Sequence, residues 1–483
     1  MKRWPEAPRV TWMCGIAGFR GAGARDKVAA MLNTIGHRGP DARGLYHDGR
    51  ITIKTSEGED VLEAPPSEDI ALGHNLLSIV GGPQPVSGDG VLVFNGEIYS
   101  HDIPAGGDAH LILDLIEAHG DDLEDAIRFA VSELDGDYAF IYTDGVNLAA
   151  VRDPVGVKPL YHSGEAFASE RKALWSIGLR NIESLPPGHA IINGRLVKLR
   201  GLPQPRTCTE SPHELKGLLK SAIRESVKKR TRGLRKAALV FSGGVDSTLL
   251  AVLLREYLDI TLYTVGTPGS PDVEFASRAA EDLGMDLKVI EVTEEAVRGA
   301  LPHVLGAIEV YNPMQIAIAM PLYLASREAS AAGFRVMFSG QGADELFAGY
   351  HRYRRLLEDG NLEDALMHDL ENIYQVNLER DDAVTMANSV ELRVPFLDLR
   401  VIELALTTPT CFKIRGPDDE MRKHILREVA AEMGVPDYIA RRPKKAAQYG
   451  SGIDRILRRR VLPGFDHESF LRRLMNDGGV FQR

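Results

Sequence analysis

The chain has 483 residues, of which 44% are hydrophobic and 26% are charged, and this length predicts two or three domains that each bury a core. The formal net charge of −11 argues against a long nucleic-acid surface, which needs a basic stripe, and no stretch approaches the roughly 20 apolar residues of a membrane span. The three cysteines are isolated and no signal peptide is recognisable, so we expect a cytoplasmic protein without a zinc or redox pair.

The first part of the chain, residues 14–200, is predicted to form a layered α+β domain. Short apolar runs punctuated by Gly, Asp and Pro predict strands at residues 16–19, 90–94, 139–142, 148–151 and 190–192. A helix is predicted at residues 111–119. A linker rich in Pro and Thr follows at residues 201–212.

The second part, residues 213–460, shows strands that alternate with helices, which predicts an α/β domain with a doubly wound parallel sheet. Strands are expected at residues 237–241, 260–265, 287–292 and 335–338, and helices at residues 215–229, 248–257 and 272–283. The remainder of the chain is predicted to be mostly helical.

A glycine-rich loop follows the strand predicted at 237–241 and reads Ser-Gly-Gly-Val-Asp-Ser at residues 242–247. Its glycines let backbone N–H groups approach a phosphate closely, and the start of the next helix adds positive dipole. Ser242 and Ser247 supply hydroxyl donors, and Asp246 is a candidate ligand of Mg²⁺. No lysine follows the glycines, so this is not the P-loop that ends in Gly-Lys-Ser/Thr. The alternative interpretation is a strand-to-helix turn capped by serines.

A second loop of this kind follows the strand at 335–338 and reads Ser-Gly-Gln-Gly-Ala-Asp-Glu at residues 339–345. Two such loops on one parallel sheet can flank a single ligand at the carboxyl ends of the strands. Asp344 is therefore a second candidate ligand of Mg²⁺.

Cys14 directly follows Met13 near the start of the chain. A thiol with a pKa of about 8.5 needs a base that works near neutral pH, and a free α-amino group, at about 7.7–8.0, suits this task better than a lysine at about 10.4. A cysteine at the first position therefore carries its own base. We expect residues 1–13 to be absent from the active protein, with Met13 as the true start that is then removed. The alternative is that Cys14 is a small buried residue at the start of a strand.

The motifs of the first domain resemble, in order, the class II glutamine amidotransferase domain, whose fold is an α+β layered N-terminal-nucleophile glutaminase. They lie at residues 14–19, 37–41, 95–99, 152–161, 167–170 and 186–189. The glycine loops resemble the pyrophosphate-loop ATP enzymes, which cleave ATP between the α- and β-phosphates. Both domains in this order resemble the asparagine synthetase family, from residue 14 to about residue 453, and this stretch includes residues 387–398 and the matching segment at 423–427.

The resemblance implies ATP-dependent amidation of aspartate to asparagine with ammonia from glutamine. The implied intermediate is aspartyl-AMP, the released products are AMP and pyrophosphate, and the implied cofactors are ATP and Mg²⁺. It also implies an internal tunnel that carries ammonia between the two sites. We expect small-molecule partners only, with no nucleic acid and no membrane, and a homodimer is left open.

Family roles carry over to matching positions only. By this resemblance the catalytic candidates are Cys14, Asn95, Gly96 and Gln341, with Asn95 and Gly96 forming the oxyanion hole. The glutamine-binding candidates are Asn95, Gly96, Glu97 and Asp108, and Asp108 would hold the α-ammonium group. The ATP-binding candidates are Val240, Ser242, Gly243, Gly244, Asp246, Ser247, Val265, Ser339, Gly340 and Lys444, and the metal candidates are Asp246 and Asp344. Without the resemblance, Lys444 is equally well interpreted as part of a solvated charge run.

Three positions depart from the family pattern. Leu76 stands where an arginine would pair with the glutamine α-carboxylate. Gln341 stands where the second loop usually has a glutamate, and an amide cannot act as a base. Ala317 stands at the position of an arginine near the substrate acid. The surrounding stretch, residues 314–319, predicts either a less polar pocket or one whose charges come from other residues.

Three alternatives stay open at the sequence level. The first is the same machinery forming an amide, or closing a ring, on another carboxylic acid, which the stretch 314–319 favours. The second is a pyrophosphate-loop enzyme that modifies tRNA, which the acidic charge disfavours. The third is a sensor that binds nucleotide without catalysis, which the presence of Cys14, Asp246 and Asp344 disfavours.

Overall fold

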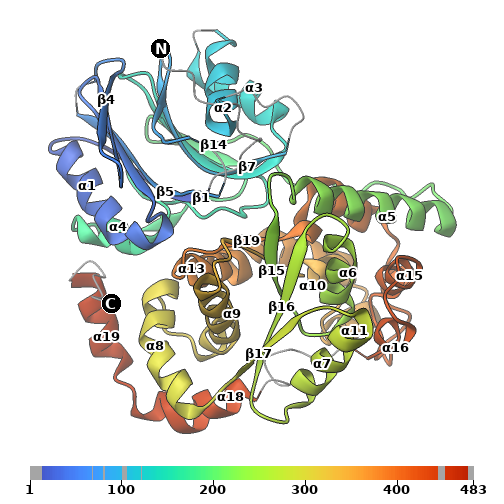
Figure 1. Ribbon diagram of the computed structural model, residues 1–483. Helices are drawn as coiled ribbons and strands as arrows, with labels where there is room; N and C mark the ends of the chain where they lie inside the picture. The colour runs from blue at the N-terminus through green and yellow to red at the C-terminus, as the bar shows by residue number, and fades with distance from the viewer. Residues whose placement is uncertain are drawn as a thin grey trace.

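Two antiparallel sheets organise the first part of the chain and one parallel sheet organises the second (Figure 1). The computed structural model describes residues 13–67, 69–79, 82–99, 106–120, 122–443 and 452–476. Within these residues, no helix combines the length and the apolar character that crossing a membrane requires.

The first sheet has eight strands in the order β12-β10-β11-β1-β5-β2-β3-β4. Its strands are β1 (Met13–Arg20), β2 (Ala42–His47), β3 (Arg50–Thr55), β4 (Glu59–Glu63), β5 (Ile70–Leu77), β10 (Tyr161–Ser163), β11 (Ala166–Ala168) and β12 (Glu183–Ser184). The strand with the predicted nucleophile, β1, lies inside the sheet, where β5 and β11 pair with it on either side. Strand β5 pairs along the whole of β1, including Cys14, whereas β11 pairs with residues 17–19.

The second sheet has six strands in the order β14-β13-β9-β8-β7-β6. Its strands are β6 (Val86–Ser87), β7 (Val91–Ile98), β8 (Gly136–Thr143), β9 (Leu148–Arg152), β13 (His189–Ile192) and β14 (Arg195–Lys198). The two sheets pack face to face, because Ile16 and Leu72 of the first share a fully buried cluster with Val93 and Ile141 of the second.

Helices cover the outer face of each sheet in this first domain. Helices α1 (Ala24–Thr34) and α4 (Arg171–Ser176) pack on the eight-stranded sheet, and α2 (Asp108–Glu117) and α3 (Leu123–Glu133) pack on the six-stranded sheet (Figure 1). The result is a four-layer arrangement, which confirms the predicted layered α+β class. Helix α3 was not predicted, although its buried positions follow a helical spacing.

The second domain has a five-stranded sheet in the order β17-β16-β15-β18-β19, and all neighbouring strands are parallel. Its strands are β15 (Lys236–Val240), β16 (Asp259–Gly266), β17 (Leu287–Glu291), β18 (Val336–Phe338) and β19 (Glu391–Arg393). The order reverses between β15 and β18, and a parallel sheet binds its ligand at such a switch point. This confirms the predicted doubly wound parallel sheet.

Helices surround this sheet and continue to the end of the described chain. They are α5 (Pro212–Lys229), α6 (Val245–Leu254), α7 (Pro271–Leu283), α8 (Glu294–Ile308), α9 (Pro313–Ala331), α10 (Ala343–Leu346), α11 (Tyr353–Glu358), α12 (Leu362–Ile373), α13 (Glu379–Met386), α14 (Leu399–Thr407), α15 (His424–Glu432), α16 (Asp437–Ala440), α18 (Ile453–Ile456) and α19 (His467–Asn476). The start of α5 shows why a helix begins there: Ser211 and Glu214 form a capping box around Pro212 in the first turn.

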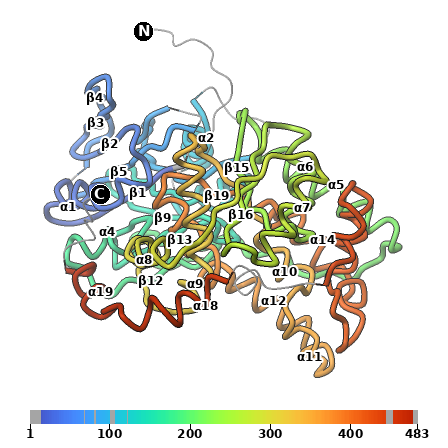
Figure 2. Tube along the Cα trace, turned by 60° about the horizontal axis from the view of Figure 1, so that its bottom comes forward, coloured from blue at the N-terminus to red at the C-terminus, as the bar shows by residue number. Residues whose placement is uncertain are grey.

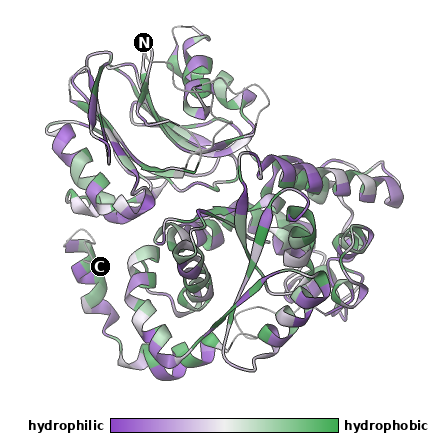
Figure 3. Cartoon of the chain, in the orientation of Figure 1, coloured by the Kyte–Doolittle hydropathy of each residue, from purple (hydrophilic) through white to green (hydrophobic). Residues whose placement is uncertain are grey.

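Apolar and hydrophilic residues are distributed according to these layers. Figure 3 shows apolar residues along the central strands and hydrophilic residues on the outer turns of α1 and α5. The last helix, α19, returns to the first domain and lies beside α4 (Figure 2). Phe470 and Leu474 of α19 are buried in the same apolar cluster as Trp175 of α4. Helix α19 therefore packs against both halves of the molecule.

Candidate active sites

The predicted nucleophile, Cys14, lies at the start of β1 with its backbone nitrogen next to the predicted oxyanion residue. The N–H of Cys14 donates to the Asn95 side-chain oxygen at 3.0 Å, and Asn95 is fully buried on β7. Gly96 follows with a φ of 152°, and a Cβ there would stand 2.2 Å from the carbonyl oxygen of Asp137. Glycine is therefore required at this position, and its sequence neighbour Asn95 is held against the backbone of Cys14.

The Cys14 thiol is fully buried while Met13 is attached to it. Burial raises its pKa far above the ordinary value, and the opposing effects, a backbone hydrogen bond at Leu77 and the charge of Arg38, are smaller. Arg38 also donates to the Cys14 carbonyl oxygen at 3.3 Å. Burial thus favours the neutral thiol. That activity needs a free amine at Cys14 stays a prediction. Residues 1–12 lie outside the described residues.

The first departure from the family pattern, Leu76, lies directly against the thiol. In the sheet register Cys14 faces Leu76 and Leu76 faces Ala42, and the three side chains form one small apolar cluster. Arg43 is next in sequence to Ala42, so its side chain points to the opposite face of the sheet, where it donates to Asn75. Arg43 therefore does not take the place of the arginine that the family pattern has at the position of Leu76.

Asp108, the predicted ligand of the glutamine α-ammonium group, and Glu97, another predicted glutamine-binding residue, are both buried acids. Asp108 starts α2 and accepts from the N–H of Ile98 at 2.9 Å, and burial raises the pKa of Asp108 to about 7. Burial also raises the pKa of Glu97, while the nearby Arg393 acts in the opposite direction. One carboxylate oxygen of each, Asp108 Oδ1 and Glu97 Oε1, is buried without a hydrogen-bond partner. Each of these oxygens can accept a hydrogen bond from a ligand's ammonium group.

The two glycine loops meet at the switch point of the parallel sheet. Asp246, in the first turn of α6, and Asp344, in the first turn of α10, both bind the ammonium group of Lys423, at 2.8 Å and 2.7 Å. Lys423 is fully buried, whereas the two aspartates keep some contact with solvent. A Cβ on Gly349 would stand 2.2 Å from Lys423 Cε, so a glycine is needed there for the lysine to reach both acids.

Lys423 is the residue of this site that the sequence did not single out. It belongs to the segment 423–427 that resembles the family, but no role was assigned to it. Both Arg422 and Lys423 have left-handed backbone conformations, with φ of 51° and 54°. Two such residues in a row are uncommon for non-glycine side chains, and strain of this kind concentrates at functional sites.

The serines of the first loop bond to each other. Ser242 Oγ lies 3.3 Å from Ser247 Oγ and also 3.3 Å from the N–H of Gly244, which is the N-cap residue of α6. No side chain caps α6. The start of α6 can thus receive an anion instead of a serine cap, which favours the nucleotide-loop interpretation.

The remaining nucleotide candidates stand around these loops. Val240 ends β15, Val265 lies one residue before the end of β16, and the Ser339 N–H donates to the Arg393 carbonyl oxygen at 3.0 Å. The others, Gly243, Gly340 and Gln341, lie within the two loops. Lys444 lies outside the described residues.

The chemistry of the donor set at Asp246 and Asp344 fits Mg²⁺. Mg²⁺ takes oxygen ligands and is commonly held by one or two carboxylates together with substrate phosphates. Two carboxylates that share one buried ammonium group are close enough to share one hydrated ion. Within the described part of the chain, no cluster of three or more His, Cys, Asp and Glu side chains offers a complete protein-only metal site, so phosphate oxygens would complete the coordination.

The third departure, Ala317, is buried in α9 and only 2% exposed. Met314, in the first turn of the same helix, is 55% exposed. Gln315 lines a cavity of about 760 Å³ between the two domains. The stretch 314–319 therefore divides into a solvent-exposed first turn, a polar contribution to this cavity and a buried apolar position.

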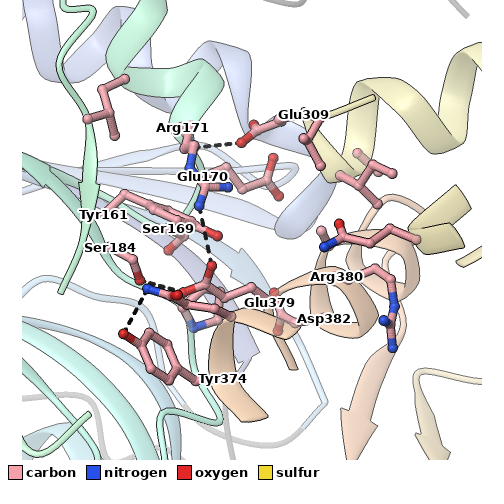
Figure 4. Close-up of a pocket in the computed structure, with 18 of the residues that line it drawn as sticks. Tyr161, Ser169, Glu170, Arg171, Ser184, Glu309, Tyr374, Glu379, Arg380 and Asp382 are labelled. Atoms are coloured by element: carbon pink, nitrogen blue, oxygen red, sulfur yellow. Dashed lines mark hydrogen bonds and ion pairs between the residues drawn. The ribbon is translucent and has the colours of Figure 1, made fainter. Parts of the chain in front are cut away.

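The cavity between the domains is polar and carries charges from both sides (Figure 4). Arg171 comes from the first domain, and Glu309, Glu379 and Asp382 come from the second. Arg38 joins these groups to the thiol site, because it forms ion pairs with Glu170 at 3.0 Å and with Asp382 at 2.8 Å. The neighbourhood of Cys14 is thus bonded directly to α13 of the second domain.

The first domain has a thiol at the start of a strand in a four-layer α+β fold. The second domain has paired carboxylates at the switch point of a parallel sheet. Together these features define an amidotransferase joined to an ATP-using ligase. The description "asparagine synthase" belongs to a family model that matches residues 218–366 and 355–474, and "glutamine amidotransferase domain" to one that matches residues 54–186.

Full-length relatives give the same result. The putative glutamine-hydrolysing asparagine synthetase 1 of Methanocaldococcus jannaschii is 37% identical, and the match covers 92% of this chain and 95% of that protein. Asparagine synthetase B of Escherichia coli K12 is 28% identical over 89% of this chain and 79% of its own length. Asparagine synthetase 2 of Arabidopsis thaliana is 28% identical over 91% and 79%. The chain belongs to the glutamine-hydrolysing asparagine synthetase family.

Proposed function

We propose that this enzyme converts aspartate to asparagine with ATP and with ammonia taken from glutamine. The observation that carries the proposal is the convergence of Asp246 and Asp344 on the buried Lys423 at the switch point of the parallel sheet. The two carboxylates offer oxygen ligands for Mg²⁺, and the ammonium group places a positive charge beside them. Binding of the ATP triphosphate requires positive charge of this kind.

The second site performs the activation. A carboxylate is a poor acyl donor, so its oxygen attacks the α-phosphorus of ATP, the bond to the β-phosphate oxygen breaks, and aspartyl-AMP and pyrophosphate form. Ammonia then attacks the acyl carbon and AMP leaves with the former carboxylate oxygen. Lys423 and the N–H groups at the start of α6 stabilise the charge on the phosphates. Asp246 and Asp344 would hold Mg²⁺, which would supply further neutralisation of the pyrophosphate charge.

The first site supplies the ammonia. In the mature chain the α-amine of Cys14 takes the thiol proton, and the sulfur attacks the side-chain amide of glutamine. Asn95 and the Gly96 N–H stabilise the oxyanion, ammonia leaves, and water hydrolyses the thioester to glutamate. The 3.0 Å contact between the Cys14 nitrogen and Asn95 supports this, because it places the future amine beside the oxyanion donor. This mechanism requires that residues 1–13 are removed.

Product identification tests the proposal. Protein that begins at Cys14 is incubated with ATP, Mg²⁺, glutamine and aspartate, and the products are identified by mass spectrometry, with the Asp246→Asn variant as the control for the nucleotide site. We expect asparagine, glutamate, AMP and pyrophosphate in equal amounts from the wild type, and glutamate alone from Asp246→Asn. ADP with phosphate in place of AMP with pyrophosphate would overturn the mechanism.

A second candidate acceptor, a different carboxylic acid, is favoured by one observation: Ala317 is apolar and buried where the family places an arginine near the acid. Pyrophosphate exchange into ATP, measured with a panel of amino and carboxylic acids, separates the two. Exchange with aspartate supports the first proposal. Exchange that is absent with aspartate but present with a less polar acid would establish the second.

A further inference from the structure

One arginine connects the glutamine site of the first domain to the nucleotide loop of the second. Arg393 ends β19 in the parallel sheet, and its side chain is 1% exposed. Its guanidinium group forms an ion pair with Glu97 at 3.0 Å across the domain boundary. Its backbone carbonyl oxygen accepts from the N–H of Ser339, the first residue of the second nucleotide loop, at 3.0 Å. Two predicted ligand-binding residues in different domains are thus linked through a single residue.

The side chain of Arg393 has few alternative positions. Its Nε donates to Glu391 at 3.1 Å, its Nη2 donates to the same carboxylate at 3.3 Å, and its Nη1 donates to the carbonyl oxygen of Arg230. A planar guanidinium group held on three sides in a buried site transmits a displacement at one edge to the whole residue. Because Ser339 is bonded to the backbone of Arg393, a shift of that residue moves the loop.

We expect binding of glutamine to displace the Arg393 side chain. Glu97 and Asp108 each keep one buried carboxylate oxygen without a hydrogen-bond partner. Arg393 lowers the pKa of both acids against the larger effect of burial, so its charge acts on the pair. A substrate ammonium group bound to these acids would be a second cation at carboxylates that Arg393 already neutralises. The two cations share the same negative charge, and glutamine therefore weakens the hold of Glu97 on Arg393.

We infer that Arg393 is a positioning residue that couples occupancy of the glutamine site to nucleotide binding at the Ser339 loop. This inference rests on the proposed function, because it takes Glu97 and Asp108 as glutamine ligands and Ser339 as a nucleotide contact. Coupling of this kind is reciprocal: glutamine changes the affinity for ATP by the same factor by which ATP changes the affinity for glutamine.

The test compares ATP affinity with the first site empty and filled. A diazoketone analogue of glutamine alkylates Cys14 in protein that begins at this residue, and intact mass verifies complete labelling. Isothermal calorimetry with ATP and Mg²⁺ gives the Kd before and after labelling. We expect the two values to differ by about fivefold or more in the wild type, which is the range of typical allosteric coupling.

Arg393→Lys keeps the charge but loses the planar group, and we expect it to bring the ratio of the two Kd values to within about twofold of unity. Arg335→Lys is the matched control, because Arg335 also pairs across the domains, with Asp41 at 3.2 Å, but is exposed and contacts neither glutamine ligand. It should keep the wild-type ratio. If Arg393→Lys does not fold, Glu97→Gln replaces it, because Glu97 is the ion-pair partner of Arg393. We expect this variant also to bring the ratio of the two Kd values to within about twofold of unity.

The inference would be overturned if Arg393→Lys showed the wild-type ratio of the two Kd values. It would also be overturned if the two Kd values were equal in the wild type. Ammonia-dependent AMP formation by the wild type is measured in parallel. If AMP forms and the ratio is one, the coupling is wrong and the proposed function stands. If no AMP forms with any acid, the proposed function itself is wrong.

Discussion

Replacing Lys423 by methionine tests the charge arrangement at the nucleotide site. The change keeps most of the side-chain length and removes an ammonium group that holds Asp246 and Asp344 at 2.8 Å and 2.7 Å. Removing one partner from a buried ion pair costs about 3–5 kcal/mol. The aspartate side chains are 16% and 21% exposed, so water can solvate them and we expect a loss of folding free energy of only about 2 kcal/mol.

The effect on catalysis should be larger than the effect on stability. In the proposed mechanism Lys423 stabilises the negative charge that shifts to pyrophosphate, and loss of one such donor costs about 2.7–4 kcal/mol of transition-state stabilisation. We expect ammonia-dependent AMP formation by Lys423→Met to fall roughly 100- to 1000-fold. Lys423→Arg should not restore the rate, because the position of Gly349 shows that there is no room for a larger group beside Cε.

The assay separates the two sites of the enzyme. AMP formation with ammonium, ATP and the acid measures the second site, and release of glutamate from glutamine measures the first. We expect Lys423→Met to retain the glutamate release of the wild type. Wild-type AMP formation in this variant would refute the assigned role, and an equal loss in both assays would show a general folding defect instead.

Three further variants test other parts of the account. Cys14→Ala should abolish glutamate release and leave ammonia-dependent AMP formation within about twofold of the wild type, and loss of both activities would argue against two independent sites. Leu76→Arg should lower the KM for glutamine roughly tenfold, because a charge-assisted bond to the α-carboxylate contributes about 1.5 kcal/mol, and an unchanged or higher KM would show that Leu76 does not face the substrate. Burial lowers the pKa of Lys413 to about 8 from 10.5, so the unfolded chain holds the proton between these values and the free energy of unfolding rises with pH across this interval. Lys413→Met should therefore raise the free energy of unfolding at neutral pH by up to about 3 kcal/mol and remove this rise, as urea denaturation at neutral pH and at about pH 10 will measure.

Local sequence patterns predicted nine of the 19 strands that the structure describes, and strands such as β2, β5 and β19 were not predicted. The run at residues 16–19 lies within β1, and the strands expected at 237–241 and 260–265 correspond to β15 and β16. Their apolar runs are bounded by glycine or charged residues, which makes short strands recognisable without tertiary information. Helix α3 could have been found by the same method, since its buried positions repeat with helical spacing.

The order of the strands was beyond local patterns. Placing β1 between β5 and β11 needs contacts between residues more than 50 positions apart, such as Cys14 with Leu76, and such pairing leaves no mark on either segment. The domain limits at residues 200 and 213 stay a prediction, as do the individual roles of the site residues.

Lys423, which joins the two nucleotide loops, and Arg393, which joins the two domains, were missed for the same reason. Lys423 lies 177 residues from Asp246, and Arg393 lies nearly 300 residues from Glu97. A lone lysine or arginine carries no signal about its partner until the chain is folded. The sequence did identify the acids at the other end of each pair, because glycine loops and the Asn-Gly-Glu motif mark them.

The central claim is that the nitrogen released beside Cys14 is captured by an acyl group activated as an AMP ester. It is tested most directly with glutamine labelled with heavy nitrogen in its side-chain amide, in the presence of unlabelled ammonium and ATP. We expect the amide product to carry mainly the heavy isotope, with one AMP formed for each amide. An amide that carries only the light isotope, or heavy product formed together with ADP, would contradict it.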